Sequence, residues 1–265
     1  MALLLIDGLN LIRRIHAGVP QDASDHDEAV RTACVASARR ALRRHRPSHV
    51  ILVMEESGDS WRAKEFPNYK KDRPPMPDDL ARGLPDIQDA LAEIGIRTLS
   101  APGFEADDVI ASIATRARDA GVAVVILSTD KSFCQLVGAR ISVFDHFNEV
   151  KRDVAWIKDR YGVSPGQLID LMSLTGDSSL GIPGVRSVGE KTAARLLETF
   201  GDVDTLIKRA KEIPGKLGEK IRAGVDDITL ARRLVALRLD VDLGANLHDY
   251  RWSSERLTDT PASPV

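Results

Sequence analysis

The chain has 265 residues, of which 43 % are hydrophobic and 29 % charged, a composition typical of a globular protein with a sizeable core. Its formal net charge of −2 excludes a protein whose whole surface binds nucleic acid, but not a basic patch beside an acidic pocket. Cys34 and Cys134 are far apart and lack metal-ligand spacing, which excludes a disulfide framework and favours a reducing compartment, the cytoplasm.

Short apolar runs alternate with helical patterns in the first part of the chain. In chain order we predict a strand at 2–6, a helix at 25–46, strands at 50–54 and 96–99 around a helix at 78–94, a helix at 105–120, and strands at 122–127 and 141–144. This alternation predicts an α/β domain over residues 1–150, with a mainly parallel central sheet and flanking helices. The polar, aromatic and proline-rich stretch 57–77 lacks periodicity, as functional loops do.

Strand signals end near residue 150. Helical patterns follow at 164–174, 189–200, 202–210 and 228–237, separated by Gly and Pro. We therefore expect a domain boundary near Lys151, a helical region over 151–250 and a flexible tail over 251–265. No run is long and apolar enough for a membrane span, and nothing in the sequence demands an oligomer, so we expect a monomer.

Acidic residues stand where a parallel sheet binds its ligands. Asp7, Glu55 and Asp130 follow predicted strands, and Glu105, Asp107 and Asp108 open a predicted helix. Ligands of such sheets bind at the carboxyl ends of the strands, so one crevice can collect six carboxylates. Their mutual repulsion predicts a divalent cation, and oxygen donors favour Mg²⁺ or Mn²⁺. For any one of these acids alone, helix capping or a turn is an open alternative.

Four motifs together resemble one known family. They are Ile6-Asp-Gly-Leu-Asn10, Glu105-Ala-Asp-Asp108, Ser128-Thr-Asp-Lys131 and the segment from Gly176 to Ala193. In this order they resemble the bacterial and phage 5′-nucleases, or flap endonucleases, and most of all the small stand-alone Xni-type enzymes. The resemblance runs to about residue 240. It implies a PIN-like 5′-nuclease domain, an arch near 57–85, a C-terminal helix–hairpin–helix region and cleavage of 5′ flaps.

The resemblance also implies the metal ligands, and the sequence departs from the family at some of them. The implied ligands are Asp7, Glu55, Glu105, Asp107, Asp108, Asp130 and Asp177, with Asp107 central to catalysis. Glu55 stands where the family usually has Asp. Ser132 and Leu180 stand where the family has further aspartates. We therefore expect one firmly held Mg²⁺, and a second that is weak or depends on substrate.

The stretch 57–77 carries the basic residues that a nucleic-acid substrate requires. Aromatic faces stack on bases, and Lys or Arg side chains pair with phosphates. In the family, a similar Tyr-Lys-x-x-Arg motif lies at the base of the arch. The resemblance therefore gives Lys70 and Arg73 catalytic and DNA-binding roles, and Tyr69 a DNA-binding role. A solvated loop with one anchoring aromatic residue is the alternative.

The segment 174–193 resembles the hairpin with which the family binds duplex DNA. Amides at a helix N-terminus attract phosphate, which predicts DNA contacts at Gly184, Gly189, Lys191 and Thr192. The family holds K⁺ here on backbone carbonyls, which would be those of Leu174, Thr175, Pro183, Val185 and Val188. Without the resemblance, this segment is a Gly-Pro turn between helices. The six histidines show no paired spacing, so we expect no zinc site.

Three functions remain open at this point. The leading one is a Mg²⁺-dependent, structure-specific 5′ nuclease acting on branched or 5′-flap DNA. A protein that binds flaps or junctions with little or no cleavage is the second, and Ser132 and Leu180 favour it. A ribonuclease of similar acidic α/β architecture is the third, and the hairpin segment argues against it.

Overall fold

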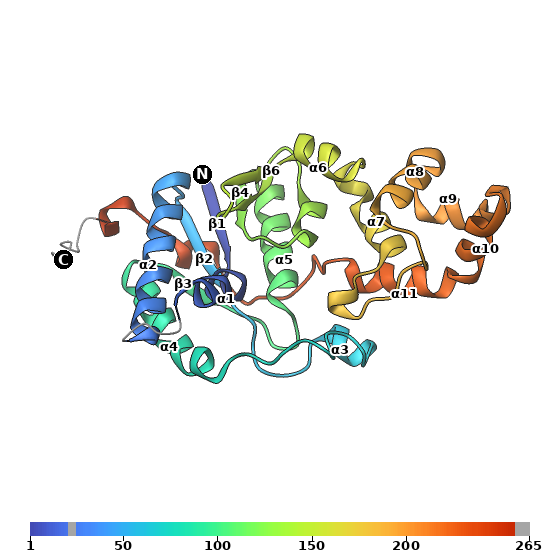
Figure 1. Cartoon of the computed structure of the whole chain (residues 1–265). Coiled ribbons are helices and arrows are strands. Elements are labelled where there is room, and N and C mark those ends of the chain that lie inside the picture. Colours follow the sequence, from blue (N-terminus) through green and yellow to red (C-terminus); the bar gives the residue numbers. More distant parts are fainter. Residues whose placement is uncertain (21–24, 258–265) are drawn as a thin grey trace.

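A computed structural model describes residues 1–20 and 25–257, and its centre is a six-stranded sheet (Figure 1). The strand order is β3-β2-β1-β4-β5-β6. The strands are β1 (Ala2–Asp7), β2 (His49–Val53), β3 (Arg97–Leu99), β4 (Ala123–Leu127), β5 (Ile141–Asp145) and β6 (Val150–Arg152). All neighbouring strands pair in parallel except β6, which is antiparallel to β5. The predicted mainly parallel α/β sheet is confirmed.

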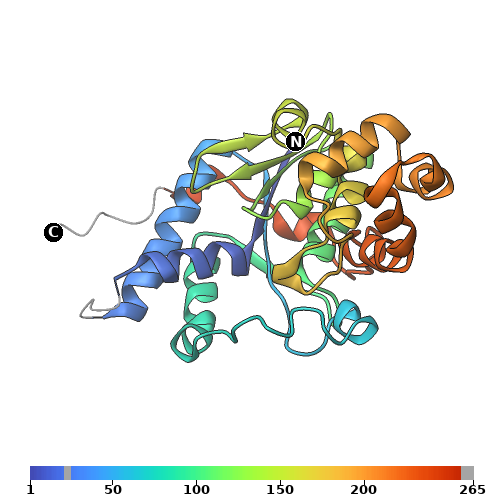
Figure 2. The same ribbon diagram turned by 45° about the vertical axis from the view of Figure 1, so that its right-hand side comes forward.

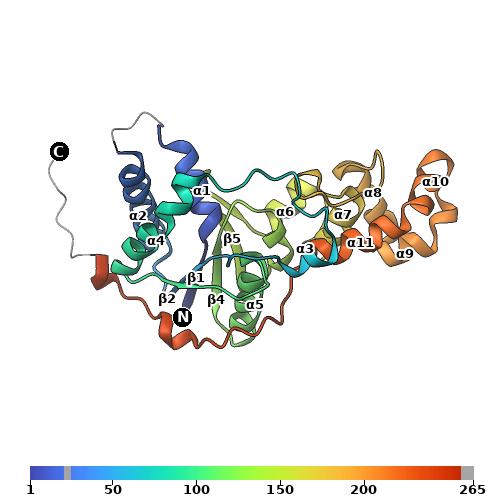
Figure 3. The same ribbon diagram turned by 90° about the horizontal axis from the view of Figure 1, so that it is seen from below.

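Helices cover both faces of this sheet. The residues of β1 are apolar in succession, as expected of a central parallel strand, whose side chains are buried on both faces of the sheet. Leu3 and Leu5 belong to one hydrophobic cluster, and Leu4 and Ile6 to the other. The second cluster lies under α1 (Gly8–Gly18), α2 (His26–His45) and α4 (Asp78–Glu93), and the first under α5 (Ala106–Asp119). Figure 3 shows these two layers on opposite sides of the strands.

A helical region extends from the α5 side of the sheet. Its helices are α6 (Val154–Tyr161), α7 (Leu168–Thr175), α8 (Glu190–Phe200), α9 (Val203–Lys208), α10 (Gly215–Ala223) and α11 (Val225–Val235). Here α7 packs between α8 and α11. The short helix α3 (Trp61–Glu65) begins the stretch that leads to α4, and Figure 2 shows this stretch passing beneath the hairpin between α7 and α8. The predicted C-terminal helical region is confirmed.

Some predicted boundaries differ from the structure. The expected domain boundary near Lys151 falls inside β6, so the sheet continues past it. The helices α1, α3, α6 and α10 were not predicted. The expected tail is wrong at its start, because Trp252 is 7 % exposed and its indole Nε1 donates to the carbonyl of Ile94 at 3.0 Å. The rest of that tail, residues 258–265, lies outside the described residues.

Within the described ranges, no helix combines the length and the apolar character needed to cross a lipid bilayer.

Candidate functional site

A cavity of about 1080 Å³ opens at the carboxyl edge of the sheet. Six of the seven acids expected as metal ligands line it: Asp7, Glu55, Glu105, Asp107, Asp130 and Asp177. The same cavity is lined by basic residues, namely Arg13, Arg14, Arg62, Lys70, Arg73 and Lys131. This cavity is therefore built from several parts of the chain: the strand ends, the start of α5, the hairpin between α7 and α8, and the stretch before α4.

Asp7, Asp107 and Asp130 form the acidic centre of the cavity. Asp7 ends β1, caps α1 by accepting from the Asn10 amide at 3.3 Å, and accepts from Ser128 Oγ at 2.7 Å. Burial raises the pKa of Asp7 to about 7, and the carboxylates of Asp130 and Glu55 add to the rise. Burial also raises the pKa of Asp107 well above its usual range, and Asp130 and Asp7 reinforce it. Each carboxylate therefore makes ionisation of the others harder.

The repulsion between these carboxylates indicates which residues can hold a divalent cation. A divalent cation removes the repulsion between Asp7, Asp107 and Asp130, and the exposed Glu55 lines the same cavity. Within the described part of the chain, no three of these acids place ligand atoms within 4.8 Å of one another. Such open spacing suits Mg²⁺, which keeps several waters and uses only one or two direct carboxylates. The donor set therefore fits a hydrated, oxygen-liganded cation.

Asp108 corrects the expected ligand set. It is 0 % exposed and does not line the cavity. Its carboxylate forms a bidentate pair with Arg62 at 2.7 and 2.9 Å, and accepts from Trp61 Nε1 at 2.8 Å and from the Arg238 amide at 2.9 Å. With these donors on its two oxygens, Asp108 joins α3 and the segment after α11 to α5 and faces away from the cation site.

The carboxylate of Glu105 also interacts with other side chains of this chain. It accepts from Arg62 Nη1 at 2.7 Å and from the Tyr69 hydroxyl at 3.0 Å, and its other oxygen pairs with Lys70 Nζ. Tyr69 is only 7 % exposed, so it lies beneath Lys70 instead of offering a face to DNA, contrary to expectation. Glu105 therefore orients Lys70 at the cavity wall.

Lys70 and Arg73 reach the cavity from an unusual backbone turn. Lys70 has φ 55°, in the left-handed region, and its amide donates to the Leu180 carbonyl at 2.9 Å. The Arg73 amide donates to the Lys70 carbonyl at 3.0 Å. The hairpin thus holds the backbone of the stretch 57–77 at Lys70, and Lys70 and Arg73 line the same cavity as the acids.

Beside Ser132 and Leu180, where the family has further aspartates, Asp177 pairs with a lysine of this chain. Lys131 Nζ lies 3.1 Å from Asp177 Oδ2, and Ser179 Oγ donates to Asp177 Oδ1 at 2.6 Å. Burial acts to raise the pKa of Asp177, but the Ser179 hydrogen bonds and the Lys131 ammonium outweigh it and lower the pKa. The Ser132 amide donates to Asp130 Oδ1 at 2.7 Å. Asp177 is therefore charged and partly neutralised by Lys131.

Sequence reasoning missed two residues on α1. Asn10 exchanges hydrogen bonds with Thr129, donating to its Oγ1 at 3.0 Å and accepting from its amide at 3.1 Å. Arg13 and Arg73 both line the cavity, and burial together with the Arg73 guanidinium lowers the pKa of Arg13. The spacing of Asp7, Asn10 and Arg13 on one helical face was the available signal.

The hairpin has the close backbone contacts expected of a phosphate-binding turn. A Cβ on Gly184 would overlap the main chain of Thr175, so only glycine fits there. Gly189 is the N-cap of α8, and the exposed Lys191 lies in its first turn. Of the carbonyls expected to bind K⁺, Leu174 accepts from the Val185 amide and Val185 from the Val188 amide, both at 2.9 Å.

Comparison with known proteins agrees with this architecture. Residues 2–162 match the family model "5′-3′ exonuclease, N-terminal resolvase-like domain", and residues 163–257 match "5′-3′ exonuclease, C-terminal SAM fold". A flap endonuclease Xni of a Shewanella species is 42 % identical over 253 residues, covering 95 % of each chain. The Aeromonas hydrophila flap endonuclease Xni is 41 % identical over 254 residues, covering 94 % of this chain and 95 % of its own.

A solved structure shows the same fold. The structure described as T5 5′-exonuclease with bound divalent metal ions (zinc) superposes with a TM-score of 0.78 at 20 % identity, covering 89 % of both chains. The sequence resemblance to 5′-nucleases of the Xni type is confirmed by these relatives. This chain belongs to the 5′-3′ exonuclease and flap endonuclease family.

Proposed function

We propose that this chain is a metal-dependent, structure-specific nuclease that cleaves the 5′ flaps of branched DNA. The observation that carries the proposal is one cavity in which Asp7, Asp107 and Asp130 face Lys70 and Arg73. Such a cavity combines carboxylates for a cation with cationic side chains for a phosphate. The relatives at 41–42 % identity are named flap endonucleases, which supports the same substrate class.

The cation we propose is one firmly held Mg²⁺, which one or two of the carboxylates of Asp7, Asp107 and Asp130 would bind directly and the others, with Glu55, through water. When bound, Mg²⁺ supplies an activated water and neutralises charge on the phosphodiester. Lys70 and Arg73 bind the scissile phosphate and offset its negative charge, and Glu105 keeps Lys70 aimed into the cavity. Because Lys131 already neutralises part of the charge on Asp177, the second cation we propose is weak or depends on the substrate.

We propose that the hairpin between α7 and α8 holds duplex DNA through K⁺. Its ligands are the carbonyls of Leu174, Thr175, Pro183, Val185 and Val188. The hydrogen bonds on the Leu174 and Val185 carbonyls leave a second lone pair on each oxygen. Amides near Gly189 and the side chains of Lys191 and Thr192 add phosphate contacts at the start of α8.

A second candidate function is binding of flaps or junctions with little cleavage. It is favoured by Lys131, whose ammonium neutralises Asp177, and by Ser132 and Leu180 at positions where the family has aspartates. An internal cation of this kind satisfies Asp177 without a second metal.

Cleavage of a labelled 5′-flap DNA separates the two functions. We expect product with Mg²⁺, none with EDTA, and a loss of at least about 100-fold in Asp107→Asn, since a cation ligand contributes several kcal/mol to the transition state. Asp119→Asn is the matched control, because Asp119 lies at the opposite end of the same helix and pairs with Arg118 at 2.8 Å.

Each alternative outcome has a clear meaning. Flap binding without product in any divalent metal would support the second function. Full cleavage by Asp107→Asn would contradict the proposed site.

A further inference from the structure

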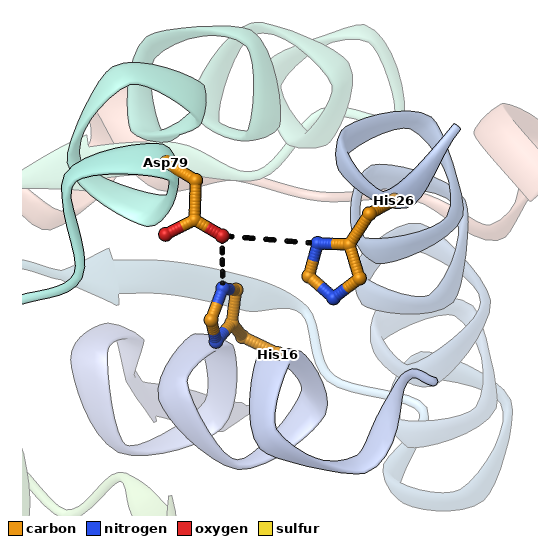
Figure 4. A group of neighbouring side chains, drawn as sticks. All are labelled: His16, His26 and Asp79. Atoms are coloured by element: carbon orange, nitrogen blue, oxygen red, sulfur yellow. Dashed lines mark hydrogen bonds and ion pairs between the residues drawn. The ribbon is translucent and has the colours of Figure 1, made fainter. Parts of the chain in front are cut away.

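Three side chains outside the nuclease cavity converge on one point (Figure 4). His16 Nε2 lies 2.9 Å from Asp79 Oδ2, and His26 Nδ1 lies 3.9 Å from the same oxygen. All three atoms lie within 4.8 Å of one another. In the described part of the chain, no other group of three His, Cys, Asp or Glu residues is this compact. Histidine spacing did not predict this cluster, because its three residues are distant from one another in the chain.

Each of the three residues comes from a different helix. His16 lies in the last turn of α1, His26 is the first residue of α2, and Asp79 is the second residue of α4. The side chains of His16 and His26 are only 11 % and 13 % exposed, and that of Asp79 is 34 % exposed. The imidazole rings meet edge to face, with centroids 5.0 Å apart. The fold therefore keeps two imidazoles largely out of water beside one accessible carboxylate.

The arrangement points to a cation because one oxygen faces two nitrogens. His16 Nε2 lies within hydrogen-bond distance of Asp79 Oδ2, and His26 Nδ1 faces the same oxygen from 3.9 Å (Figure 4). Two ligands of a tetrahedral Zn²⁺ lie roughly 3.3 Å apart when each ligand is about 2.0 Å from the ion. The observed separations of 2.9 and 3.9 Å lie on either side of this value.

We propose that His16, His26 and Asp79 form a binding site for Zn²⁺ or a similar transition-metal dication, distinct from the nuclease cavity. Two imidazole nitrogens and one carboxylate are donors that favour Zn²⁺ over Mg²⁺, whereas the cavity offers only oxygens. Asp27 Oδ1 lies 4.0 Å from His26 Nδ1, so a fourth donor is within reach, with water as the other occupant.

The position of the site gives it a structural role. Helix α1 carries Asn10 and Arg13 to the cavity at one end and His16 at the other. Asp79 opens α4 directly after the stretch that carries Arg73. A cation held by all three residues therefore fixes α1, α2 and α4 to one another at the point where the stretch 57–77 ends and α4 begins.

Binding is tested with Zn²⁺ by calorimetry, and with Co²⁺ by visible absorption, on the whole chain in excess Mg²⁺, which keeps the oxygen-liganded cavity occupied. We expect one Zn²⁺ per chain, and at least about 10-fold weaker binding in His26→Gln and in Asp79→Asn, a change of about 1.4 kcal/mol. Zn²⁺ also raises the thermal midpoint of the unaltered chain but not of these variants.

Two matched controls exclude general effects of the substitutions. His248→Gln removes an exposed histidine outside the cluster, and Asp78→Asn removes the neighbouring acid in the same turn of α4. Both variants bind Zn²⁺ as the unaltered chain does. If the chain takes up no Zn²⁺, or if His26→Gln and Asp79→Asn bind it with unchanged affinity, the cluster is only a His–Asp hydrogen bond and the proposal fails. None of these readouts depends on cleavage of DNA.

Discussion

Asp107 and Asp108 are neighbours on α5 whose carboxylates meet opposite environments. Successive helical residues point about 100° apart, so one can face the cavity while the next faces the protein interior. Asp107 lies among acids, and burial together with Asp130 and Asp7 raises its pKa. Asp108 lies among donors, chiefly the Arg62 guanidinium. One local sequence thus serves the cation site and the packing of α3.

This contrast predicts opposite effects on stability. In EDTA at pH 7.5, Asp108→Asn lowers the free energy of unfolding by about 3–5 kcal/mol, because it leaves the Arg62 charge buried without its full partner. Asp107→Asn raises the free energy of unfolding, because it removes a repelled carboxylate. Urea denaturation of both variants measures the difference. Equal destabilisation by the two substitutions would contradict the assigned environments.

The sequence predicted which acids gather at the sheet edge but not which residues they contact. Strand ends and a helix start were enough to bring Asp7, Asp107 and Asp130 together. The role of Asp108 was missed because its partner Arg62 lies 46 residues away. Tyr69 was misassigned for the same reason, since its burial depends on packing against Glu105. Local patterns carry no information about such distant pairs.

At the scale of elements, the parallel strands and several helices were predicted well, whereas α1, α3, α6, α10 and β6 were missed. The helices α2, α4, α5 and α8 and the first five strands lie within a few residues of their predictions. Helix α1 was missed because Asp7-Gly8 also fits a turn. Helix α10 contains Gly215 and Gly218, which weaken a helical pattern, and β6 has only three residues. Tertiary packing decides these elements.

The hairpin between α7 and α8 contacts the backbone of the stretch 57–77, and this contact positions Lys70. Gly181 has φ 70°, and a Cβ there would overlap the carbonyl oxygen of Asn68. The neighbouring Leu180 carbonyl holds the Lys70 amide. We expect Gly181→Ala to displace Lys70 and to lower kcat/KM on a 5′-flap substrate about 10- to 100-fold, as a catalytic group out of place does.

Gly201→Ala is the control for backbone strain alone. Gly201 has φ 85°, and a Cβ there meets no atom within 4 Å. Its substitution costs about 1 kcal/mol of stability and leaves kcat/KM unchanged. If Gly181→Ala and Gly201→Ala lower activity equally, strain and not the Asn68 contact is responsible.

At the scale of the whole molecule, charge is separated more sharply than the net charge of −2 suggests. Acids at the sheet edge face cations carried by α1 and by the stretch before α4. Composition allowed such a local arrangement, but only the fold shows which helices carry the cations. A consequence is that the metal-free molecule carries electrostatic strain at its centre, and this strain depends on pH.

Asp7 determines the sign of that pH dependence. Its pKa is 3.8 in an ordinary environment and about 7 in the fold, so the folded chain binds the proton more tightly than the unfolded chain does. Below about pH 4, Asp7 is largely protonated in both the folded and the unfolded chain, so its ionisation does not change the free energy of unfolding. As pH rises from about 4 to about 7, the free energy of unfolding falls, by about 4 kcal/mol in total for this group. In EDTA, Asp7→Asn is therefore more stable than the unaltered chain at pH 8 and equally stable at pH 4.

Urea denaturation from pH 4 to pH 8 measures this difference between the two chains. Asparagine keeps the helix cap, because its side-chain oxygen accepts from the Asn10 amide as Asp7 does. Added Mg²⁺ should stabilise the unaltered chain at pH 8 and have a much smaller effect on Asp7→Asn, since a dication relieves the repulsion only where the carboxylate is present. A stability difference that is constant from pH 4 to pH 8 would mean that Asp7 titrates normally and that the cavity is not strained by its acids.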